Sequence, residues 1–286
     1  MTPPTAPVPH LKETTVDGAT LRYAERGEGD PLVLLHGWPE SHLAWEHQLG
    51  PLSANRRVIA PDLLGWGASD RDLALSHDYD TEVDRIARML DALGLDRVDL
   101  AAHDYGGFLG VGFVQRYPHR VRRFAILNSR GHSVLAAPYY QLFGIFTTAA
   151  RHRVTRPLLT TPLIHLVHRL GMRKYVRNGT FEADRLDHYL SVLRTRAGRR
   201  WYAHFWSGYQ VRVRRELAAG LPAITCPTTV IWGTHDPGIR FRTALELTRA
   251  IPTAQLVRID GDHFIMEQRP DEVTEALLDW LDRPAD

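Results

Sequence analysis

The chain has one cysteine, two lysines and no uninterrupted apolar run of about 18 residues. Cys226 has no partner for an internal disulfide and is expected to be a buried small hydrophobe. The lack of a long apolar run excludes a membrane-spanning helix. The start, MTPPTAPVPH, lacks the charged residues and apolar stretch of a signal peptide, so we expect a cytoplasmic protein. Nearly all cations are arginine, a usage typical of a GC-rich bacterial genome.

A large charge of either sign is also missing. The formal net charge is +2, from 35 Lys and Arg against 33 Asp and Glu. The arginines are spread along the chain without a basic tail, so no nucleic-acid partner is expected. With 286 residues, 44% hydrophobic and 24% charged, the chain fits one large globular α/β domain that carries an inserted subdomain.

Short apolar runs alternate with segments of helical periodicity, which predicts a mostly parallel sheet with helices on both faces. Ahead of them, 14–23 is predicted to form an antiparallel hairpin around the turn pair Asp17-Gly18. A helix is expected at 81–95, with Asp80 or Thr81 as its N-cap. The strands are predicted at LVLLHG 32–37, RVIAPD 57–62, VDLAAHD 98–104, FAILNS 124–129, TTVIWG 228–233 and QLVRID 255–260, and further helices at 242–251 and 270–281.

The segment 131–221 interrupts this alternation. It is rich in Arg, His and aromatic residues, shows helical patterning and contains no clear strand. We therefore predict a core domain formed by 1–130 together with 222–286, and a helical cap formed by 131–221.

The stretch AHDYGG at 102–107 has the form of a nucleophile elbow. In such an elbow a strand ends in a sharp turn that exposes one side chain, and glycines then let the next helix approach the sheet. Asp104 stands at the exposed position. Because a carboxylate is ionised at neutral pH, Asp104 can attack an sp³ carbon without a base to deprotonate it. The product of that attack is an ester, and its hydrolysis needs a base.

Two later strand ends supply the base and a group to orient it. His263, in GDHF, is the candidate base, and Asp236, in GTHDP, is the candidate acid beside it. Asn128, at the end of another strand, occupies the alternative position for the acid but cannot carry the charge. The order nucleophile, acid, histidine is the order of α/β-hydrolases.

These motifs, with HGWPE at 36–40 and DLLGWGASD at 62–70, resemble the Asp-nucleophile branch of the α/β-hydrolase fold from about residue 32 to 281. That branch contains epoxide hydrolases, haloalkane dehalogenases and haloacetate dehalogenases, and HGWPE is most similar to the epoxide hydrolases. The resemblance implies an eight-stranded, mostly parallel sheet with an inserted helical cap, and a reaction without metal or other cofactor. The backbone N–H groups of Trp38 and Tyr105 are the expected oxyanion hole.

The branches differ in what stabilises the leaving group. Haloalkane dehalogenases typically hold halide with a Trp just after the nucleophile and with an Asn or second Trp, whereas haloacetate dehalogenases place Arg just after the nucleophile. This chain has Tyr105 just after the nucleophile and Trp38 at the position that follows His36-Gly37. Epoxide hydrolases use two cap tyrosines whose O–H groups donate to the epoxide oxygen. Similarity of the surrounding residues favours Tyr140 and Tyr202, with Tyr139 and Tyr209 as competitors.

The rest of the substrate pocket is expected to include His36, Pro39, Tyr139, Tyr209 and Phe264, of which His36 and Pro39 also shape their loop. The sequence thus predicts an epoxide hydrolase that converts an oxirane into a vicinal diol through an ester on Asp104. Its expected substrate is small, apolar or aromatic and epoxide-like; no nucleic-acid or membrane partner is expected, and a homodimer stays open. Three alternatives remain: a haloalkane or haloacetate dehalogenase, a natural-product tailoring enzyme that opens an epoxide, and a catalytically silent ligand receptor on the same fold.

Overall fold

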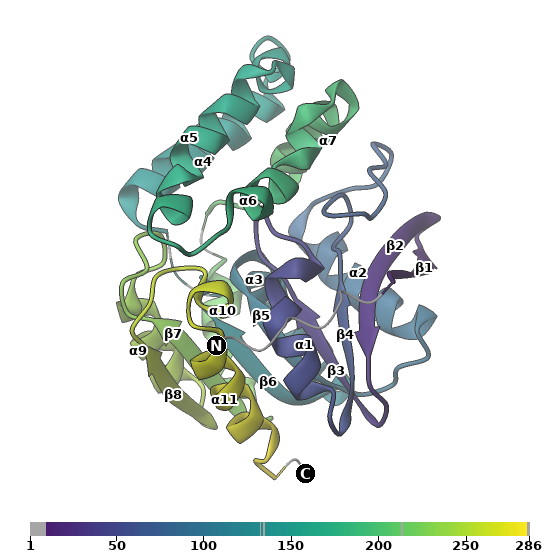
Figure 1. Ribbon diagram of the computed structural model, residues 1–286, viewed down its shortest axis with the longest axis vertical. Helices are drawn as coiled ribbons and strands as arrows, with labels where there is room; N and C mark the ends of the chain where they lie inside the picture. Colours follow the sequence, from purple (N-terminus) through teal and green to yellow (C-terminus); the bar gives the residue numbers. More distant parts are fainter. Residues whose placement is uncertain (1–9, 132, 134, 213, 285–286) are drawn as a thin grey trace.

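An eight-stranded sheet forms the centre of the protein, as the computed structural model shows for residues 10–284 apart from 132, 134 and 213 (Figure 1). Residues 1–9 of the Pro-rich start MTPPTAPVPH lie outside this range. The strand order is β1-β2-β4-β3-β5-β6-β7-β8, and every pairing from β4 to β8 is parallel. The predicted eight-stranded, mostly parallel sheet is therefore confirmed. The strands are β1 (Lys12–Val16), β2 (Ala19–Arg26), β3 (Asp30–Leu35), β4 (Arg56–Pro61), β5 (Val98–His103), β6 (Val121–Leu127), β7 (Thr228–Gly233) and β8 (Ala254–Ile259).

The antiparallel edge of the sheet is the predicted hairpin. Val16 pairs with Ala19, and the turn between them places Asp17 at φ 55° and Gly18 at φ 81°. Two successive positive φ angles define the turn type that matches the twist of paired strands.

Cys226, predicted to be buried, precedes β7 and is half-buried. Burial raises the pKa of its thiol to about 11.

Helices cover both faces of the sheet because its central strands are apolar on both sides. In β3, Leu32 and Leu34 belong to one hydrophobic core, and Val33 and Leu35 to the other, as the alternation of side chains along a strand requires. The helices of the core are α1 (Glu46–Leu52), α2 (Tyr79–Ala92), α3 (Asp104–Arg116), α9 (Phe241–Ala250), α10 (Ile265–Gln268) and α11 (Pro270–Leu281).

Helix α2 begins two residues earlier than its apolar stripe predicts. Its N-cap is Asp78, whose carboxylate accepts a hydrogen bond from the Thr81 N–H at 3.0 Å. The prediction of Asp80 or Thr81 as the cap is wrong. The reason is that Tyr79 already contributes a buried side chain to the helix, so the first turn forms ahead of the stripe that the sequence displays.

A second group of helices comes between β6 and β7 in the sequence. In space it sits over one end of the sheet (Figure 1). It holds α4 (Ala137–Arg151), α5 (Leu163–Arg177), α6 (Ala183–Tyr189), α7 (Arg196–Gly208) and α8 (Arg215–Gly220), and we call this group the cap. Short 3₁₀ turns complete the chain: η1 (His42–Trp45), η2 (Pro118–Arg120), η3 (Arg156–Thr160), η4 (Ser191–Arg194) and η5 (Leu221–Ala223). None of the helices within the described residues is long and apolar enough to cross a bilayer.

The cap is held against the loop that follows β4 by close packing. Trp201 of α7 is fully buried and meets Trp66 edge to face, with ring centroids 5.0 Å apart. The adjacent Gly65 has φ 87°, and a Cβ at this position would lie 1.8 Å from the Trp201 ring. Only glycine lets the loop pass beneath this tryptophan, so the contact fixes where α7 lies above the carboxyl ends of the strands.

Candidate active site

The elbow predicted at Asp104 is formed where β5 turns directly into α3. Asp104 has φ 43°, a left-handed conformation that non-glycine residues adopt at a cost of about 1–2 kcal/mol. Two glycines make the turn possible: a Cβ on Gly106 would lie 2.6 Å from the His36 carbonyl oxygen, and one on Gly107 2.5 Å from Ser129 Cβ. The Ser129 hydroxyl also donates to the Asp104 carbonyl oxygen at 2.6 Å. The backbone is thereby locked with the Asp104 side chain directed away from the sheet.

The two oxygens of the Asp104 carboxylate have different surroundings. Oδ2 accepts a hydrogen bond from the Trp38 backbone N–H at 2.9 Å. Oδ1 lies 3.8 Å from Nε2 of His263. The N–H of Tyr105, the other predicted oxyanion-hole donor, lies in the first turn of α3, where helix N–H groups lack an intrahelical acceptor. Its role stays a prediction.

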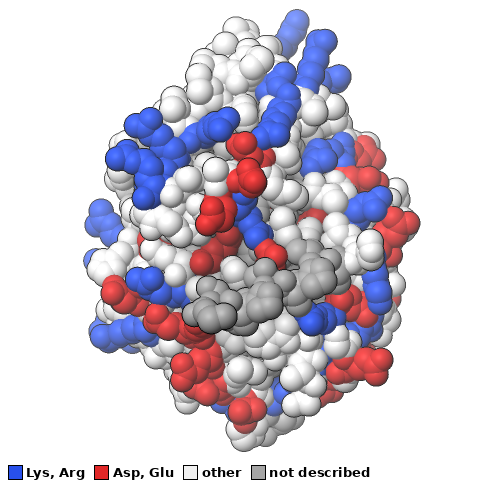
Figure 2. All heavy atoms as spheres, in the orientation of Figure 1, with Lys and Arg blue, Asp and Glu red and all other residues white. Residues whose placement is uncertain are grey.

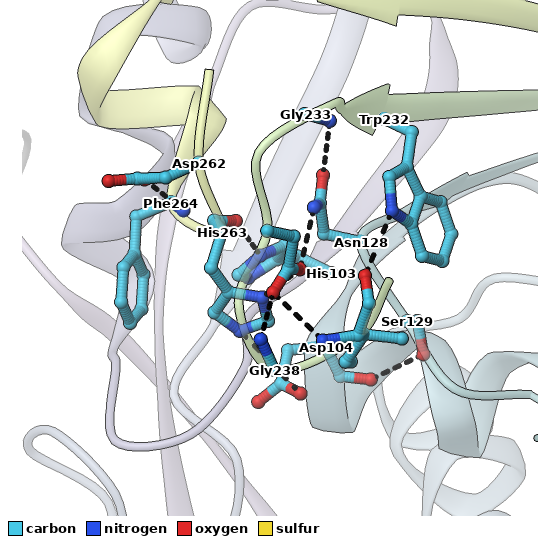
Figure 3. A network of polar contacts seen from close by, with 12 residues as sticks. His103, Asp104, Asn128, Ser129, Trp232, Gly233, Gly238, Asp262, His263 and Phe264 are labelled. Carbon is cyan, nitrogen blue, oxygen red and sulfur yellow. Dashed lines mark hydrogen bonds and ion pairs between the residues drawn. The ribbon is translucent and has the colours of Figure 1, made fainter. Parts of the chain in front are cut away.

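His263 lies beside Asp104 (Figure 3), and Asp236, which follows a different strand, contacts His263 there. The Nδ1 of His263 lies 2.6 Å from Oδ2 of Asp236. The other oxygen, Oδ1, accepts hydrogen bonds from the N–H groups of Gly238 at 2.7 Å and Ile239 at 2.8 Å. With its carboxylate held from several sides, Asp236 can fix the ring of His263 so that Nε2 faces Asp104.

Asn128, set aside in the sequence because it carries no charge, turns out to be a positioning residue. Its Nδ2 donates to Oδ2 of Asp236 at 2.7 Å, and its Oδ1 accepts from the Gly233 N–H at 2.9 Å (Figure 3). Asn128 is fully buried and has φ 38°. The signal in the sequence was its place at the end of a strand, next to the end that carries Asp236.

The charges around His263 favour its protonated form. Burial lowers the pKa of His263, but the carboxylate of Asp236 outweighs this, and Asp104 and Glu40 add to it, so the pKa rises to about 9. Burial also works against the ionised form of Asp236, but the His263 cation and the hydrogen bonds lower the pKa of Asp236 overall. At neutral pH the imidazolium therefore lies between two carboxylates.

A second buried pair, Glu40 and His103, supports both sides of this arrangement. Oε2 of Glu40 accepts from the Gly37 N–H at 2.6 Å and lies 2.9 Å from Nδ1 of His103. Since a carbonyl oxygen only accepts, Nε2 of His103 donates to the carbonyl oxygen of His263 at 2.9 Å. The pair thus links the loop that carries Trp38 with the loop that carries His263. The first of these loops contains a cis peptide bond between Trp38 and Pro39.

Above Asp104 lies a cavity of about 140 Å³ between the core and the cap. Two residues predicted for the pocket, Tyr139 and Phe264, line it, whereas His36, Pro39 and Tyr209 are absent from its lining. His36 is fully buried, and its Nε2 accepts from the Leu63 N–H at 3.0 Å, so it is structural. The lining also includes Trp38, Leu142, Phe146, Val167, His168, Lys174 and Tyr175.

The predicted proton donor Tyr140 does not face this cavity. It lines two depressions elsewhere on the cap surface, away from Asp104. The preceding residue, Tyr139, faces the cavity instead, because successive residues on an α-helix point about 100° apart. The YQLF stretch therefore lies on a helix turn that reaches the cavity, but the tyrosine that lines the cavity is Tyr139 and not the predicted Tyr140.

Tyr202 is buried beneath the cavity and its hydroxyl is occupied. Nδ1 of His168 must donate to the Ile164 carbonyl oxygen at 2.8 Å, so Nε2 of the neutral ring is an acceptor. The Tyr202 hydroxyl lies 2.6 Å from this Nε2 and donates to it. Burial lowers the pKa of His168 to about 4, so the ring is neutral at pH 7. The Tyr202 proton is therefore directed at His168, and Tyr202 does not line the cavity as the predicted proton donor would.

The Tyr139 hydroxyl group has Lys174 and Tyr175 as polar neighbours. Its oxygen accepts a hydrogen bond from Nζ of Lys174 at 3.1 Å, which leaves the O–H group available to a ligand. Tyr175, which the sequence reasoning missed, lines the same cavity, and burial raises its pKa strongly, with Tyr139 adding to the shift. The pKa of Tyr209 is raised by burial and also by the charge of Asp104, so its phenol lies near the site without lining the cavity.

The fold and this arrangement of residues define an α/β hydrolase, and the sequence comparison agrees: residues 30–270 match the family described as alpha/beta hydrolase fold. The chain belongs to this family, whose known members include hydrolytic enzymes. Among the described residues, no three His, Cys, Asp or Glu side chains are grouped as a metal site would require.

Similar proteins include several that carry out different reactions. Haloalkane dehalogenase 2 of Mycobacterium tuberculosis is 28% identical over 272 residues, covering 91% of this chain and 90% of that protein. A soluble epoxide hydrolase from a Corynebacterium species is 27% identical over 283 residues, with coverages of 94% and 96%. A cis-3-alkyl-4-alkyloxetan-2-one decarboxylase of Shewanella oneidensis is 26% identical over 294 residues, with coverages of 93% and 86%. The solved structure of Cfl2 from Burkholderia cenocepacia aligns over 94% of this chain and 95% of its own at 26% identity, with a TM-score of 0.77.

Proposed function

We propose that the protein is an epoxide hydrolase that opens an oxirane through an ester on Asp104. The observation that carries the proposal is the asymmetric environment of the Asp104 carboxylate. Oδ2 is held by the Trp38 N–H, so it is prepared to become the carbonyl oxygen of the ester. Oδ1 is left to attack the substrate carbon in line with the breaking C–O bond.

Ring opening needs a hydrogen-bond donor at the departing oxygen. Tyr139 fits this role because it lines the cavity and Lys174 donates to its oxygen, which leaves its proton for the epoxide oxygen. Tyr175, beside it in the lining, is the second candidate. Tyr140 is not proposed, because it faces away from the cavity. The C–O bond breaks, the oxygen receives a proton, and a hydroxyalkyl ester of Asp104 remains.

Hydrolysis of the ester uses a water bound beside Asp104 and His263. Their separation of 3.8 Å exceeds a direct hydrogen bond, and a water seated beside the pair can contact both groups. His263 in its neutral form removes a proton from this water, whose oxygen adds to Cγ of Asp104. The Trp38 N–H stabilises the resulting oxyanion. Collapse of the intermediate releases the diol, with the proton returned from His263, and restores the carboxylate.

A single-turnover reaction in ¹⁸O-labelled water tests this route. The first diol should carry unlabelled oxygen, because its new oxygen comes from Oδ1 of Asp104. After many turnovers, label should appear in the Asp104 carboxylate itself, which mass spectrometry of the peptide can measure. Label in the diol of the first turnover would instead mean direct attack by water and would end the proposal.

A second candidate, a haloalkane dehalogenase, is favoured by two buried indole N–H groups. Trp38 Nε1 and Trp206 Nε1 are buried and make no hydrogen bond of regular geometry among the described residues, although both lie near the Tyr202 hydroxyl; their ring centroids are 6.0 Å apart. Trp38 lines the cavity. A halide ion released from a substrate carbon accepts hydrogen bonds from such groups, and the same ester on Asp104 would form.

The two candidates are separated by their products. Purified protein should convert a panel of epoxides to diols and release no halide from haloalkanes or haloacetate at a comparable rate. Halide release without diol formation would reverse the ranking, and the Asp104→Asn variant serves as the inactive control for both assays.

A further inference from the structure

The outer face of the cap exposes most of the large apolar side chains that the protein leaves in solvent. Ten such side chains are exposed in the described part of the chain, and eight of them lie between residues 142 and 170. They are Leu142, Ile145, Val154, Leu158, Leu163, Leu166, Val167 and Leu170. Ile145, Val154, Leu158 and Leu163 are each more than 60% exposed. Soluble surfaces rarely concentrate apolar residues in this way without a partner.

Helix α5 displays this exposure as a stripe. Its inner face buries Ile164, His168, Met172 and Tyr175. Its outer face carries exposed residues at the helical spacing i, i+3, i+4, i+7, i+11 and i+14, which are Leu163, Leu166, Val167, Leu170, Lys174 and Arg177. The first four are apolar and the last two are basic. No acidic residue lies in α5.

The charge of the protein is divided between cap and core. Residues 131–221 contain 15 Lys and Arg against 4 Asp and Glu, a formal charge of +11, whereas the rest of the chain carries 20 against 29, a formal charge of −9. The small net charge of the whole chain hides this division. In Figure 2 the upper end of the molecule, where Figure 1 places the cap, shows basic and uncharged side chains, and acidic ones gather lower down.

The mouth of the active-site cavity opens within this face. Leu142 of α4 and Val167 and Lys174 of α5 line the cavity and are also exposed, so they form its rim. The two helices meet just below, where Phe146 stacks on His168 with ring centroids 5.5 Å apart. The passage to Asp104 therefore starts between α4 and α5, among exposed apolar and basic side chains.

We propose that the outer face of the cap docks on an anionic lipid bilayer surface, with the exposed residues of α4 and α5 at the lipid boundary. A helix with an apolar face flanked by Lys and Arg binds such surfaces through buried apolar area and attraction to anionic headgroups. This departs from the expectation that no membrane partner exists. That expectation rested on the lack of a spanning segment, and peripheral binding does not need one.

Two other occupants of this face fit less well. A second copy that packed cap against cap would bring together two segments that each carry a formal charge of +11, which opposes association. A nucleic acid would satisfy the cations but leave Leu163, Leu166 and their neighbours without apolar contacts. A bilayer of anionic lipid satisfies both features at once.

The docking also indicates a substrate class, and this part rests on the proposed epoxide hydrolysis. The cavity of about 140 Å³ is close to the size of an apolar cavity that holds benzene, about 150 Å³. It accommodates the oxirane and a short substituent, and a longer chain would extend through the mouth between Leu142 and Val167. Lipophilic epoxides with a terminal or near-terminal ring, drawn from the bilayer, match this shape.

Co-sedimentation of the full chain with vesicles tests the docking without any turnover. The protein should bind vesicles that contain phosphatidylglycerol, bind phosphatidylcholine vesicles at least about tenfold more weakly, and lose affinity as salt rises. The Leu163→Ser/Leu166→Ser variant and the Arg177→Glu variant should each weaken binding by about tenfold or more. Their matched controls, Leu278→Ser and Arg249→Glu, change an exposed leucine and an exposed arginine of the core and should bind like the wild type.

The outcomes separate this proposal from the others. No binding to anionic vesicles at low salt, or equal binding by the leucine variant and the wild type, would overturn docking. A dimer in light scattering that disappears in the leucine variant would overturn it in favour of a second copy. The Asp104→Asn variant should bind vesicles normally, so a failure of the epoxide hydrolase proposal leaves the docking result intact.

For the substrate class, activity on long-chain epoxides should rise with anionic vesicles in the wild type and not in the leucine variant; equal activity in both would reject delivery from the bilayer.

Discussion

The Nε2 of His263 faces Oδ1 of Asp104 across 3.8 Å, although the two residues are 159 positions apart in the sequence. This distance is too long for a direct hydrogen bond, and a water seated beside the two atoms can contact both. In the proposed reaction, His263 is thus placed to take a proton from a water that attacks the ester carbon of Asp104. A nucleophile that is already ionised requires its base only in the second half of the reaction.

Replacement of the base should trap the ester. In His263→Gln, Asp104 can still attack, while water activation falls by about 10²–10⁴-fold, the usual contribution of a general base. Intact-protein mass spectrometry should then show an added mass equal to that of the substrate. The Asp104→Asn variant should show no adduct, and an adduct there would place the nucleophile elsewhere.

Removal of the charge on Asp104 should lower the pKa of His263. The wild-type pKa of about 9 is raised mainly by Asp236 and partly by Asp104, so His263 is protonated below this pH and neutral above it. Loss of the Asp104 charge, in Asp104→Asn or in the ester, removes one of the stabilising carboxylates. The imidazole then becomes neutral at a lower pH, where it can serve as a base.

An NMR titration of the His263 imidazole checks this sign. The midpoint in Asp104→Asn should lie below that of the wild type, and in Asp236→Asn lower still, because Asp236 is the stronger of the two influences. In the wild type, the rate of ester hydrolysis should rise with pH until the pKa of the ester form is passed. A midpoint that rises in Asp104→Asn would contradict the electrostatic account.

The neighbouring tyrosines Tyr139 and Tyr140 provide a matched test of the leaving-group donor. Tyr139→Phe removes a hydroxyl that lines the cavity and should slow ring opening by about 10²-fold. Tyr140→Phe removes a hydroxyl that faces away and should change the rate by no more than about twofold. Pre-steady-state measurement of ester formation on one epoxide compares them; the reverse order of effects would restore the prediction made from sequence.

Glu40 should affect catalysis without contacting the substrate. In Glu40→Gln the charge that faces His103 is lost, and hydrogen bonds to charged groups contribute about 1.5–3 kcal/mol. The loops that carry Trp38 and His263 should then be less well fixed, so kcat should fall while KM stays close to that of the wild type. The pKa of His263 should also decrease, since Glu40 helps to raise it. A change confined to KM would argue for a direct role in binding.

Two glycines with positive φ separate backbone strain from steric overlap. Gly94 has φ 68° and open space around its Cα, so Gly94→Ala should lower the free energy of unfolding by only about 1–2 kcal/mol. Gly65→Ala adds a Cβ that would lie 1.8 Å from the ring of Trp201, and overpacking adds about 1–3 kcal/mol to a similar strain. Urea denaturation should show the larger loss for Gly65→Ala. Equal decreases in the free energy of unfolding would mean that Trp201 moves to accommodate the added methyl group.

The sequence alone identified the strands, the elbow and the triad candidates because these depend on short-range patterns. Central strands buried on both faces must be continuously apolar, and an elbow needs glycine where α3 approaches the sheet, as at Gly106 and Gly107. The carboxyl ends of parallel strands meet at one edge of a sheet, however long the segments that connect them. Asp104, Asp236 and His263 could therefore be chosen as site candidates from the sequence alone. The N-cap of α2 was missed because Tyr79 enters the helix ahead of the visible stripe.

Only the tertiary structure decided which cap side chains reach the site. A rotation of about 100° separates Tyr139 from Tyr140, and no local pattern fixes the rotation of a helix whose faces are all partly apolar. Packing settles it, through contacts such as Phe146 on His168 and Trp201 over Gly65. The same is true of the outward stripe of α5: the sequence holds its leucines and its charges, but their exposure depends on which face of the helix the rest of the protein covers.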